Sequence, residues 1–192
     1  MFGEISLDDE DDNTLMLAYG SGRVDAFDAL YARYRKPLYQ FVLHGCSDKA
    51  LAAEIFQDVW ASVIQARTQF DKSGTFKSWL YRIARNKLID FYRKNRAKDH
   101  DSYDEEAEHS QLSTLEQPLT PSELAELGTD QVRVQNAIDS LPWKQRDAVI
   151  LKYVAGCSLA EISLQQGESM ETVKSRLRYA YSKLRQQLRA ES

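Results

Sequence analysis

Cationic and aromatic side chains are interleaved between residues 79 and 94, and this mixture is typical of a surface that binds nucleic acid. The aromatic residues are Trp79, Tyr81, Phe91 and Tyr92, and the cations are Arg82, Arg85, Lys87, Arg93 and Lys94. Cations neutralise phosphates and release counterions, while aromatic rings offer flat surfaces to unstacked bases. A solvated basic face over an ordinary aromatic core would have the same composition, so this cluster alone leaves both interpretations open.

A second group of cations lies near the C-terminus, on a segment with the pattern of a helix-turn-helix. Ser158, with Glu161 three residues later, forms a capping box that starts a helix. Gly167 stands where that helix must end, and Ser169 can cap the next one. In the second helix one face is apolar, through Val173, Leu177, Ala180, Leu184 and Leu188, and another carries Lys174, Arg178, Tyr181 and Arg185. Such a pair of helices matches a motif that docks in a DNA major groove, and it favours nucleic-acid binding for both basic clusters.

A third group of polar residues lies on the helix predicted to begin near Asp48. Glu54 and Asp58 are four residues apart and share a face, with Gln57 and Trp60 beside them. Paired carboxylates can perform acid/base chemistry, but no nucleophile, metal ligand set or glycine-rich phosphate loop accompanies them. We therefore expect no catalytic residues, and we interpret this face as a docking surface for a basic partner, with an ordinary solvated face as the alternative.

The two cysteines, Cys46 and Cys157, are far apart in the sequence and form neither a disulfide framework nor a zinc motif. His44 and Cys46 could supply two metal ligands, but nothing nearby completes a four-ligand site. We expect reduced, partly buried thiols, and neither a metal nor a cofactor.

Helices must position all of these groups, because helical periodicity is strong and strand signals are scarce. In the first half we expect helices whose inward residues are Val24, Phe27, Leu30, Tyr31, Tyr34, Leu38 and Phe41, then Ala52, Ile55, Phe56, Val59 and Val63, then Phe76, Leu80, Ile83, Leu88 and Phe91. Pro37 should bend or interrupt the first of them, and residues 69–75 should form a loop. In the second half, residues 131–140 look helical and Leu141-Pro142 opens a further helix before the helix-turn-helix.

Charge is segregated along the chain, so the net charge of −4 hides basic and acidic blocks. Residues 4–12 carry acids and no cation, and residues 99–132 carry no Lys or Arg but include Pro118 and Pro121. These stretches cannot bury enough apolar surface to fold alone. We predict an all-α protein with an acidic, disordered N-terminal segment (1–13), a helical domain (14–97), a flexible acidic linker (98–130) and a second helical domain (131–192). The sequence shows no signal peptide and no membrane-spanning run, so we expect a cytoplasmic protein.

Together the two modules resemble a sigma factor of bacterial RNA polymerase of the extracytoplasmic-function (ECF, group IV) type. The first is similar to sigma region two at residues 25–31 (DAFDALY), 53–60 (AEIFQDVW) and 76–86 (FKSWLYRIARN). The second is similar to region four at residues 141–142 (LP) and 172–176 (TVKSR). A helix-turn-helix alone is weakly specific, whereas these blocks in this order and spacing are strongly specific.

The resemblance implies a transcription initiation factor that recognises two promoter elements. The −35 element would be read as duplex by the recognition helix, through Thr172, Lys174, Ser175, Arg176, Arg178 and Tyr179. The −10 element would be melted by the first module, with a flipped base held by Phe70, Ser73, Ile83 and Asn86 and the phosphates of the single strand held by Arg82, Arg85 and Lys87.

The resemblance also implies protein partners. Glu54, Gln57, Asp58 and Trp60 match the segment that docks on the clamp of core RNA polymerase, and the polymerase flap would be a second contact. The acidic linker would thread toward the RNA path. An anti-sigma factor would hold the chain inactive, at the inner face of the membrane where that partner is membrane-bound.

The alternative is a stand-alone helix-turn-helix regulator, which would dimerise on paired half-sites and bind duplex DNA tightly by itself. A sigma factor should instead be a monomer with weak DNA affinity when alone. An enzyme acting on nucleic acid would need a metal or nucleophile constellation, which we do not find in the sequence, so we expect no enzymatic activity.

Overall fold

The computed structural model describes residues 10–46, 48–71, 73–96 and 131–190, and every regular element in these ranges is a helix. The first unit consists of α1 (Asp12–Gly20), α2 (Val24–Cys46), α3 (Lys49–Gln65), the short 3-10 helix η1 (Arg67–Gln69) and α4 (Phe76–Arg96). The second consists of α6 (Gln131–Asp139), α7 (Trp143–Tyr153), α8 (Leu159–Gln166) and α9 (Met170–Ala190). The predicted all-α architecture of two helical domains is therefore confirmed, while the predicted linker lies outside the described residues.

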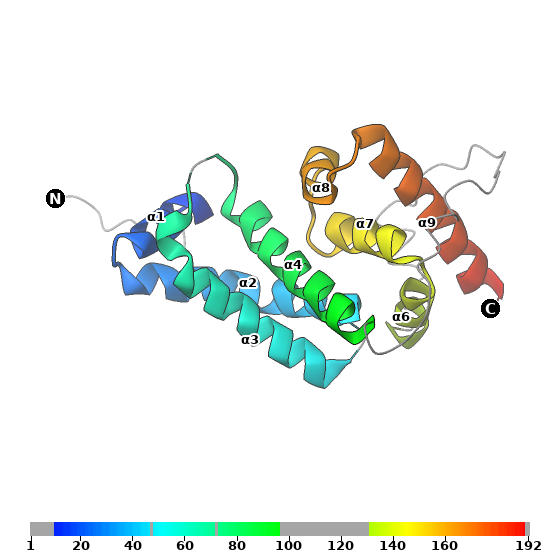
Figure 1. Ribbon diagram of the computed structural model, residues 1–192, viewed down its shortest axis with the longest axis horizontal. Coiled ribbons are helices and arrows are strands. Elements are labelled where there is room, and N and C mark those ends of the chain that lie inside the picture. Colours follow the sequence, from blue (N-terminus) through cyan, green and yellow to red (C-terminus); the bar gives the residue numbers. More distant parts are fainter. Residues whose placement is uncertain (1–9, 47, 72, 97–130, 191–192) are drawn as a thin grey trace.

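The first unit is built by α2, α3 and α4, which lie along one another as their apolar faces require (Figure 1). Leu30, Leu38 and Phe41 of α2 meet Val59 of α3 and Leu80 of α4 in a fully buried core. Val24, predicted to point inward, is instead 67% exposed; it is the first residue of α2 and faces away from the core, which Ala26 of the same turn enters. Pro37 lies inside α2 without interrupting it.

The acidic residues just before α1 belong to the folded unit, contrary to the disorder we predicted for everything before Thr14. Asp11 caps α1 by accepting hydrogen bonds from the backbone N–H groups of Asn13 (3.0 Å) and Thr14 (3.1 Å). Arg33 Nη1 donates to Asp12 Oδ1 over 2.6 Å, and Glu10 pairs with Arg23 at 3.0 Å. These carboxylates have cationic or backbone partners within reach, which composition alone did not indicate. The acids before Glu10 lie outside the described residues.

The second unit has a helix-turn-helix with the caps that the sequence predicts. Ser158 and Glu161 form a reciprocal capping box at the start of α8. Gly167 ends α8 in the left-handed conformation, with φ of 68°. Ser169 Oγ accepts a hydrogen bond of 3.1 Å from the backbone N–H of Thr172 at the start of α9. The turn is thus held from both sides by local hydrogen bonds.

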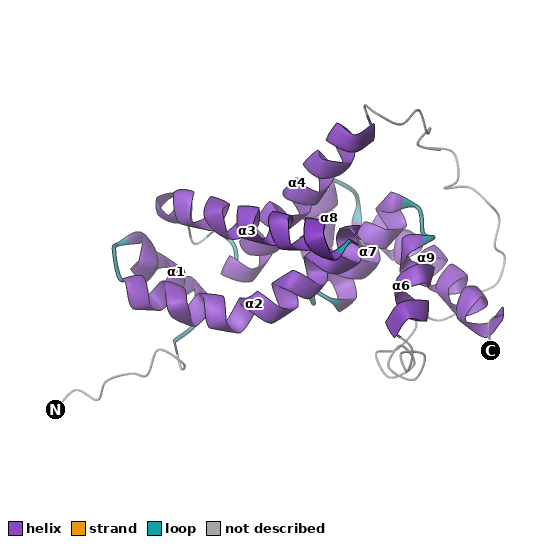
Figure 2. Cartoon of the chain, turned by 90° about the horizontal axis from the view of Figure 1, so that it is seen from below, coloured by secondary structure: helices purple, strands orange, loops and turns teal. Residues whose placement is uncertain are grey.

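The two units pack against each other, with α6 and α7 contacting α2 and with α7 and α8 beside α4 (Figure 1). The result is elongated, with α1 near one end and α9 near the other in both views (Figure 2). Within the described ranges, no helix is both long and apolar enough to cross a membrane.

Candidate nucleic-acid interface

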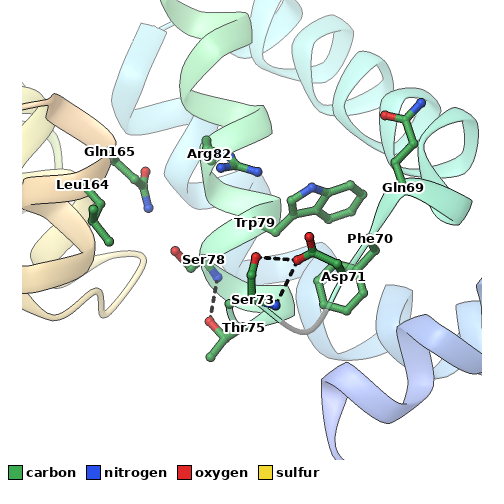
Figure 3. A pocket seen from close by; sticks show the side chains of 11 residues that line it. Gln69, Phe70, Asp71, Ser73, Thr75, Ser78, Trp79, Arg82, Leu164 and Gln165 are labelled. Atoms are coloured by element: carbon green, nitrogen blue, oxygen red, sulfur yellow. Dashed lines mark hydrogen bonds between the residues drawn. The ribbon is translucent and has the colours of Figure 1, made fainter.

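A cavity of about 490 Å³ lies between the loop that precedes α4 and the first turns of that helix (Figure 3). Its lining combines aromatic, polar and cationic side chains with two residues of α8, and consists of Gln69, Phe70, Asp71, Ser73, Gly74, Thr75, Ser78, Trp79, Arg82, Leu164 and Gln165. Such a mixture can stack against a base, hydrogen-bond its edge and neutralise a neighbouring phosphate.

The loop is held in shape by short-range hydrogen bonds. Asp71 Oδ1 accepts from the backbone N–H of Ser73 over 2.9 Å, and Thr75 Oγ1 accepts from the backbone N–H of Ser78 over 3.1 Å at the start of α4 (Figure 3). The hydrogen bonds from Ser73, the side chain first and then the backbone, lower the pKa of Asp71. The loop therefore presents an ionised carboxylate and a serine hydroxyl at the cavity wall.

Asn13 connects α1 to this loop. Its Oδ1 accepts from the backbone N–H of Phe76 over 2.6 Å, and its Nδ2 donates to the carbonyl of Gly74 over 3.1 Å. The side chain thus satisfies a first-turn N–H of α4 and fixes the loop from behind. Nothing in the periodicity of the sequence pointed to this role, because the contact joins residues 63 positions apart.

The residues predicted to hold a flipped base are only partly brought together. Phe70 and Ser73 line the cavity, as does the predicted phosphate contact Arg82. Ile83 packs against the core and Asn86 is exposed, and neither lines the cavity. Asn86 lies one turn beyond Arg82 on the same face of α4. Trp79 was predicted only as one of the aromatic residues of the basic cluster and not as part of the base pocket, but it lines the cavity, and its ring lies 5.5 Å from that of Phe70 between centroids. Its position three residues before Arg82 could have indicated this place in the pocket.

Arg85, predicted to hold a phosphate, is occupied by the second unit. Its Nε donates to Asp147 Oδ2 over 2.8 Å and its Nη1 donates to the carbonyl of Gln165 over 2.9 Å. Asp147 is only 4% exposed, and burial raises the pKa of its carboxyl group although Arg85 acts in the opposite direction. Lys87, the third predicted phosphate contact, is half-buried on the same helix.

On α9, the residues predicted to read duplex DNA divide into an outer and an inner group. Lys174 and Arg178 are exposed, and Thr172, Ser175 and Tyr179 are partly exposed. Lys174 Nζ pairs with Glu171 Oε1 at 2.6 Å, and the Arg178 guanidinium lies over the Tyr179 ring at 5.5 Å. These residues form an accessible polar and cationic face.

Arg176, predicted to contact DNA, and Tyr181, predicted to lie on the cationic face, are both buried, which corrects these two predictions. Arg176 is 5% exposed and donates to Gln166 Oε1 over 2.6 Å and to Glu168 Oε1 over 3.1 Å, so it joins α9 to α8 and the turn. The Tyr181 ring is buried against Tyr153. Both side chains support the recognition helix and do not form its outer surface.

The acidic face of α3 is present, but without Trp60. Glu54, Gln57 and Asp58 are exposed. Trp60 is 5% exposed, and its ring packs 5.0 Å from that of Tyr31 between centroids. The structure therefore places Trp60 in the core and leaves the three polar residues as the accessible surface.

The comparisons with known proteins agree with this architecture. Residues 30–98 match the family model of Sigma-70 region 2, and residues 131–184 match that of Sigma-70, region 4. The ECF RNA polymerase sigma factor SigW of Bacillus subtilis (strain 168) is 31% identical over 172 residues, which cover 88% of this chain and 91% of SigW.

Two solved structures have the same arrangement of helices. CnrH in complex with the cytosolic domain of CnrY is similar with a TM-score of 0.69 and 25% identity, over 94% of this chain and 99% of CnrH. The sigma factor RpoE of Bartonella quintana, in complex with the anti-sigma factor NepR, has a TM-score of 0.67 and 23% identity, over 86% and 98% of the two chains. With the family matches, these findings establish that the chain belongs to the ECF sigma factors, the alternative sigma factors that initiate transcription by RNA polymerase.

Proposed function

We propose that this chain binds core RNA polymerase, recognises the −35 and −10 elements of its promoters and promotes melting, without catalytic chemistry of its own. The observation that carries this proposal is the cavity beside α4, where aromatic rings, a hydroxyl and a guanidinium converge on a space large enough for a base. Melting needs no reacting group, because capture of an unpaired base shifts the duplex equilibrium.

We assign the −10 element to this cavity and the outer face of α4. Trp79 offers a partly exposed ring, Ser73 and Asp71 offer hydrogen-bonding groups, and Arg82 offers a cation for the phosphate. Asn86 extends the same face by one turn and would meet the next nucleotide. Arg85 and Lys87 complete the cationic track once Arg85 is released from Asp147.

We assign the −35 element to the outer face of α9, with Lys174 and Arg178 as the principal contacts. An arginine there can form a bidentate pair with a guanine edge, and the neighbouring Thr172 and Ser175 can reach phosphates. Arg176 contributes indirectly by fixing α9 on α8. We therefore expect substitution of Arg178 to weaken DNA binding and substitution of Arg176 to weaken the fold.

For protein partners, we propose that Glu54, Gln57 and Asp58 dock on the basic clamp of the polymerase, that the second unit contacts the flap, and that an anti-sigma factor inhibits the chain. The anti-sigma proposal extends to this chain what holds for RpoE of Bartonella quintana. A chain with these partners would act in the cytoplasm, where the polymerase is.

Transcription by purified core polymerase, with and without this chain, on fragmented genomic DNA tests the proposal. New transcript starts that share two upstream elements would support it and reveal the promoter. If the chain neither binds core polymerase nor changes the starts, and instead binds duplex DNA tightly as a dimer, the stand-alone regulator would replace it.

A further inference from the structure

We propose that the second unit is an internal competitor for single-stranded DNA, in which Asp147 and the end of α8 occupy the place of a phosphate at Arg85. This inference rests on the proposed function, because it concerns how the −10 surface is regulated. Below, region 2 means α1 to α4 and region 4 means α6 to α9.

The contacts of Arg85 are those expected for a phosphate ligand. Its Nε lies 2.8 Å from a carboxylate oxygen of Asp147, and its Nη1 lies 2.9 Å from the carbonyl oxygen of Gln165. Gln165 is next to last in α8, so its carbonyl belongs to the end of the helix that carries partial negative charge. The guanidinium thus faces a carboxylate and a helix C-terminus together, and both come from region 4.

The same carboxylate is connected to the recognition helix. Gln166 Nε2 donates to Asp147 Oδ2 over 2.8 Å, while Gln166 Oε1 accepts from Arg176 Nη1 over 2.6 Å. A continuous chain of hydrogen bonds therefore runs from α4 through α7 and α8 to α9. Through it, the proposed single-strand surface and the proposed duplex-reading helix are linked while the two regions are packed together.

Further contacts hold region 4 along α4 on either side of Arg85. Lys77 Nζ donates to the carbonyl of Gly156 over 3.2 Å, and the ring of Tyr92 lies 4.9 Å from that of Trp143 between centroids. Leu164 and Gln165 extend from α8 toward α4 at the edge of the cavity (Figure 3). Leu164 is 84% exposed, so its position there is not explained by burial. A DNA strand lying along Arg82 and Arg85 would meet these residues.

The energetics allow the packing of region 4 on region 2 to be reversible. Removing Arg85 and Asp147 from water costs much of what their attraction returns, so a buried pair contributes little net stability. When region 4 moves away, Arg85 can exchange a carboxylate for a phosphate and keep a charge-assisted bond. A partner that separates the regions therefore needs to supply only a modest free energy, and core polymerase could do so by binding both.

The test compares Asp147→Asn with Glu168→Gln in the full chain. Both changes remove one negative charge from region 4 and weaken hydrogen bonds there, but Glu168 bonds to Arg176 and not to Arg85. A fluorescein-labelled oligothymidylate is titrated at several salt concentrations by fluorescence anisotropy, and small-angle X-ray scattering reports the radius of gyration. For Asp147→Asn we expect the affinity for the oligothymidylate to rise roughly five-fold or more, and the radius of gyration to increase. The plot of log affinity against log salt concentration should be steeper by about 0.7, because one phosphate contact is gained. Glu168→Gln should stay close to the wild type in all three.

An unchanged radius and affinity in a folded Asp147→Asn variant would overturn the inference. If that variant does not fold, Lys77→Ala decides, because this substitution lies in region 2, removes the hydrogen bond to the Gly156 carbonyl and leaves every residue of region 4 unchanged. It should enlarge the radius of gyration, and an unchanged radius would again overturn the inference. Transcription with core polymerase separates the two proposals. If the wild-type chain is active in transcription and the radius of gyration of the variants is unchanged, only this inference fails. If the wild-type chain does not bind polymerase, the proposed function fails.

Discussion

At the scale of single residues, two arginines two positions apart on α9 illustrate how helix geometry decides a role. Arg178 is exposed, whereas Arg176 is buried and bonded to Gln166 and Glu168. The spacing already separates them, since Arg176 lies three residues after Val173 and four before Ala180, both buried. Residue type suggested DNA contact for both arginines, but periodicity assigns the inner one to the fold.

Alanine substitutions at these two positions should therefore have different effects. Arg176→Ala should lower the free energy of unfolding by about 1–3 kcal/mol, because it removes charge-assisted hydrogen bonds from a buried site. Arg178→Ala should change that free energy by less than about 0.5 kcal/mol and reduce promoter binding by the holoenzyme by roughly ten-fold through a lost base or phosphate contact. Urea denaturation and promoter footprinting measure the two quantities. Equal destabilisation by both substitutions would contradict the assignment.

The two thiols should also differ in reactivity. Both are unpaired; Cys157 is fully buried, and burial raises the pKa of its thiol to about 11. Burial raises the pKa of Cys46 as well, but its side chain is partly accessible. Because the thiolate is the reactive form, at pH 8 only roughly a thousandth of the buried Cys157 is ionised. Titration with Ellman's reagent should show a faster and a slower phase, and Cys46→Ser should remove the faster one. Loss of the slower phase in that variant would be the contrary result.

At the scale of elements, the caps of the helix-turn-helix were readable in advance because they depend on neighbouring residues alone. Ser158 with Glu161, then Gly167, then Ser169 each act within a few positions, and all of them adopt the predicted geometry. Periodicity likewise located the long helices. Tyr181 and Trp60 were misplaced because their residue types suggested a surface role. Each follows an apolar residue by four positions, and this spacing places both on the buried face of their helices.

What local pattern could not provide are contacts between distant segments. Arg85 and Asp147 are 62 positions apart and lie in different domains. Their pairing depends on how two separately folded units dock, and no spacing in the sequence encodes that arrangement. The bond from Asn13 to the start of α4 is of the same kind. For this reason the helices were predictable, while the completed site was predictable only in part.

The capping box at α8 predicts a pH-dependent stability. Burial alone would raise the pKa of Glu161, but hydrogen bonds from the Ser158 backbone N–H and hydroxyl, both 2.8 Å, outweigh it and lower the pKa. A lowered pKa means that the contribution is present above pH about 4.5 and is lost as the pH falls through the folded-state value. Glu161→Gln should therefore be less stable than the wild type at pH 7, by about 0.3–1 kcal/mol. Urea denaturation at several pH values should show the difference vanish in acid, and a difference independent of pH would contradict this.

At the scale of the whole molecule, the packing of region 4 on region 2 conflicts with the proposed use of both DNA-binding surfaces. In the proposed function, the outer face of α4 meets a single strand while α9 meets a duplex element elsewhere on the promoter. With Arg85 held by Asp147 and the Gln165 carbonyl, the first of these surfaces is incomplete. The packed form is thus better suited to the chain alone than to the chain at a promoter, and binding of polymerase should separate the regions.

Energy transfer between labels on the two regions can detect that separation. Donor and acceptor dyes would be attached through Ala61→Cys on α3 and Lys183→Cys on α9, both exposed, in a chain that also carries Cys46→Ser and Cys157→Ala. Core polymerase should lower the transfer efficiency, while a control pair within region 2, at Arg35→Cys and Ala61→Cys, should keep its value. If polymerase supports transcription with the doubly labelled chain and the efficiency does not fall, region 4 stays on α4 during initiation. Single-stranded DNA would then have to bind without Arg85, and the cationic track would shorten to Arg82 and Lys87. If instead polymerase lowers the efficiency without promoter DNA, the separation precedes melting, and the −10 surface is complete before the first base leaves the duplex.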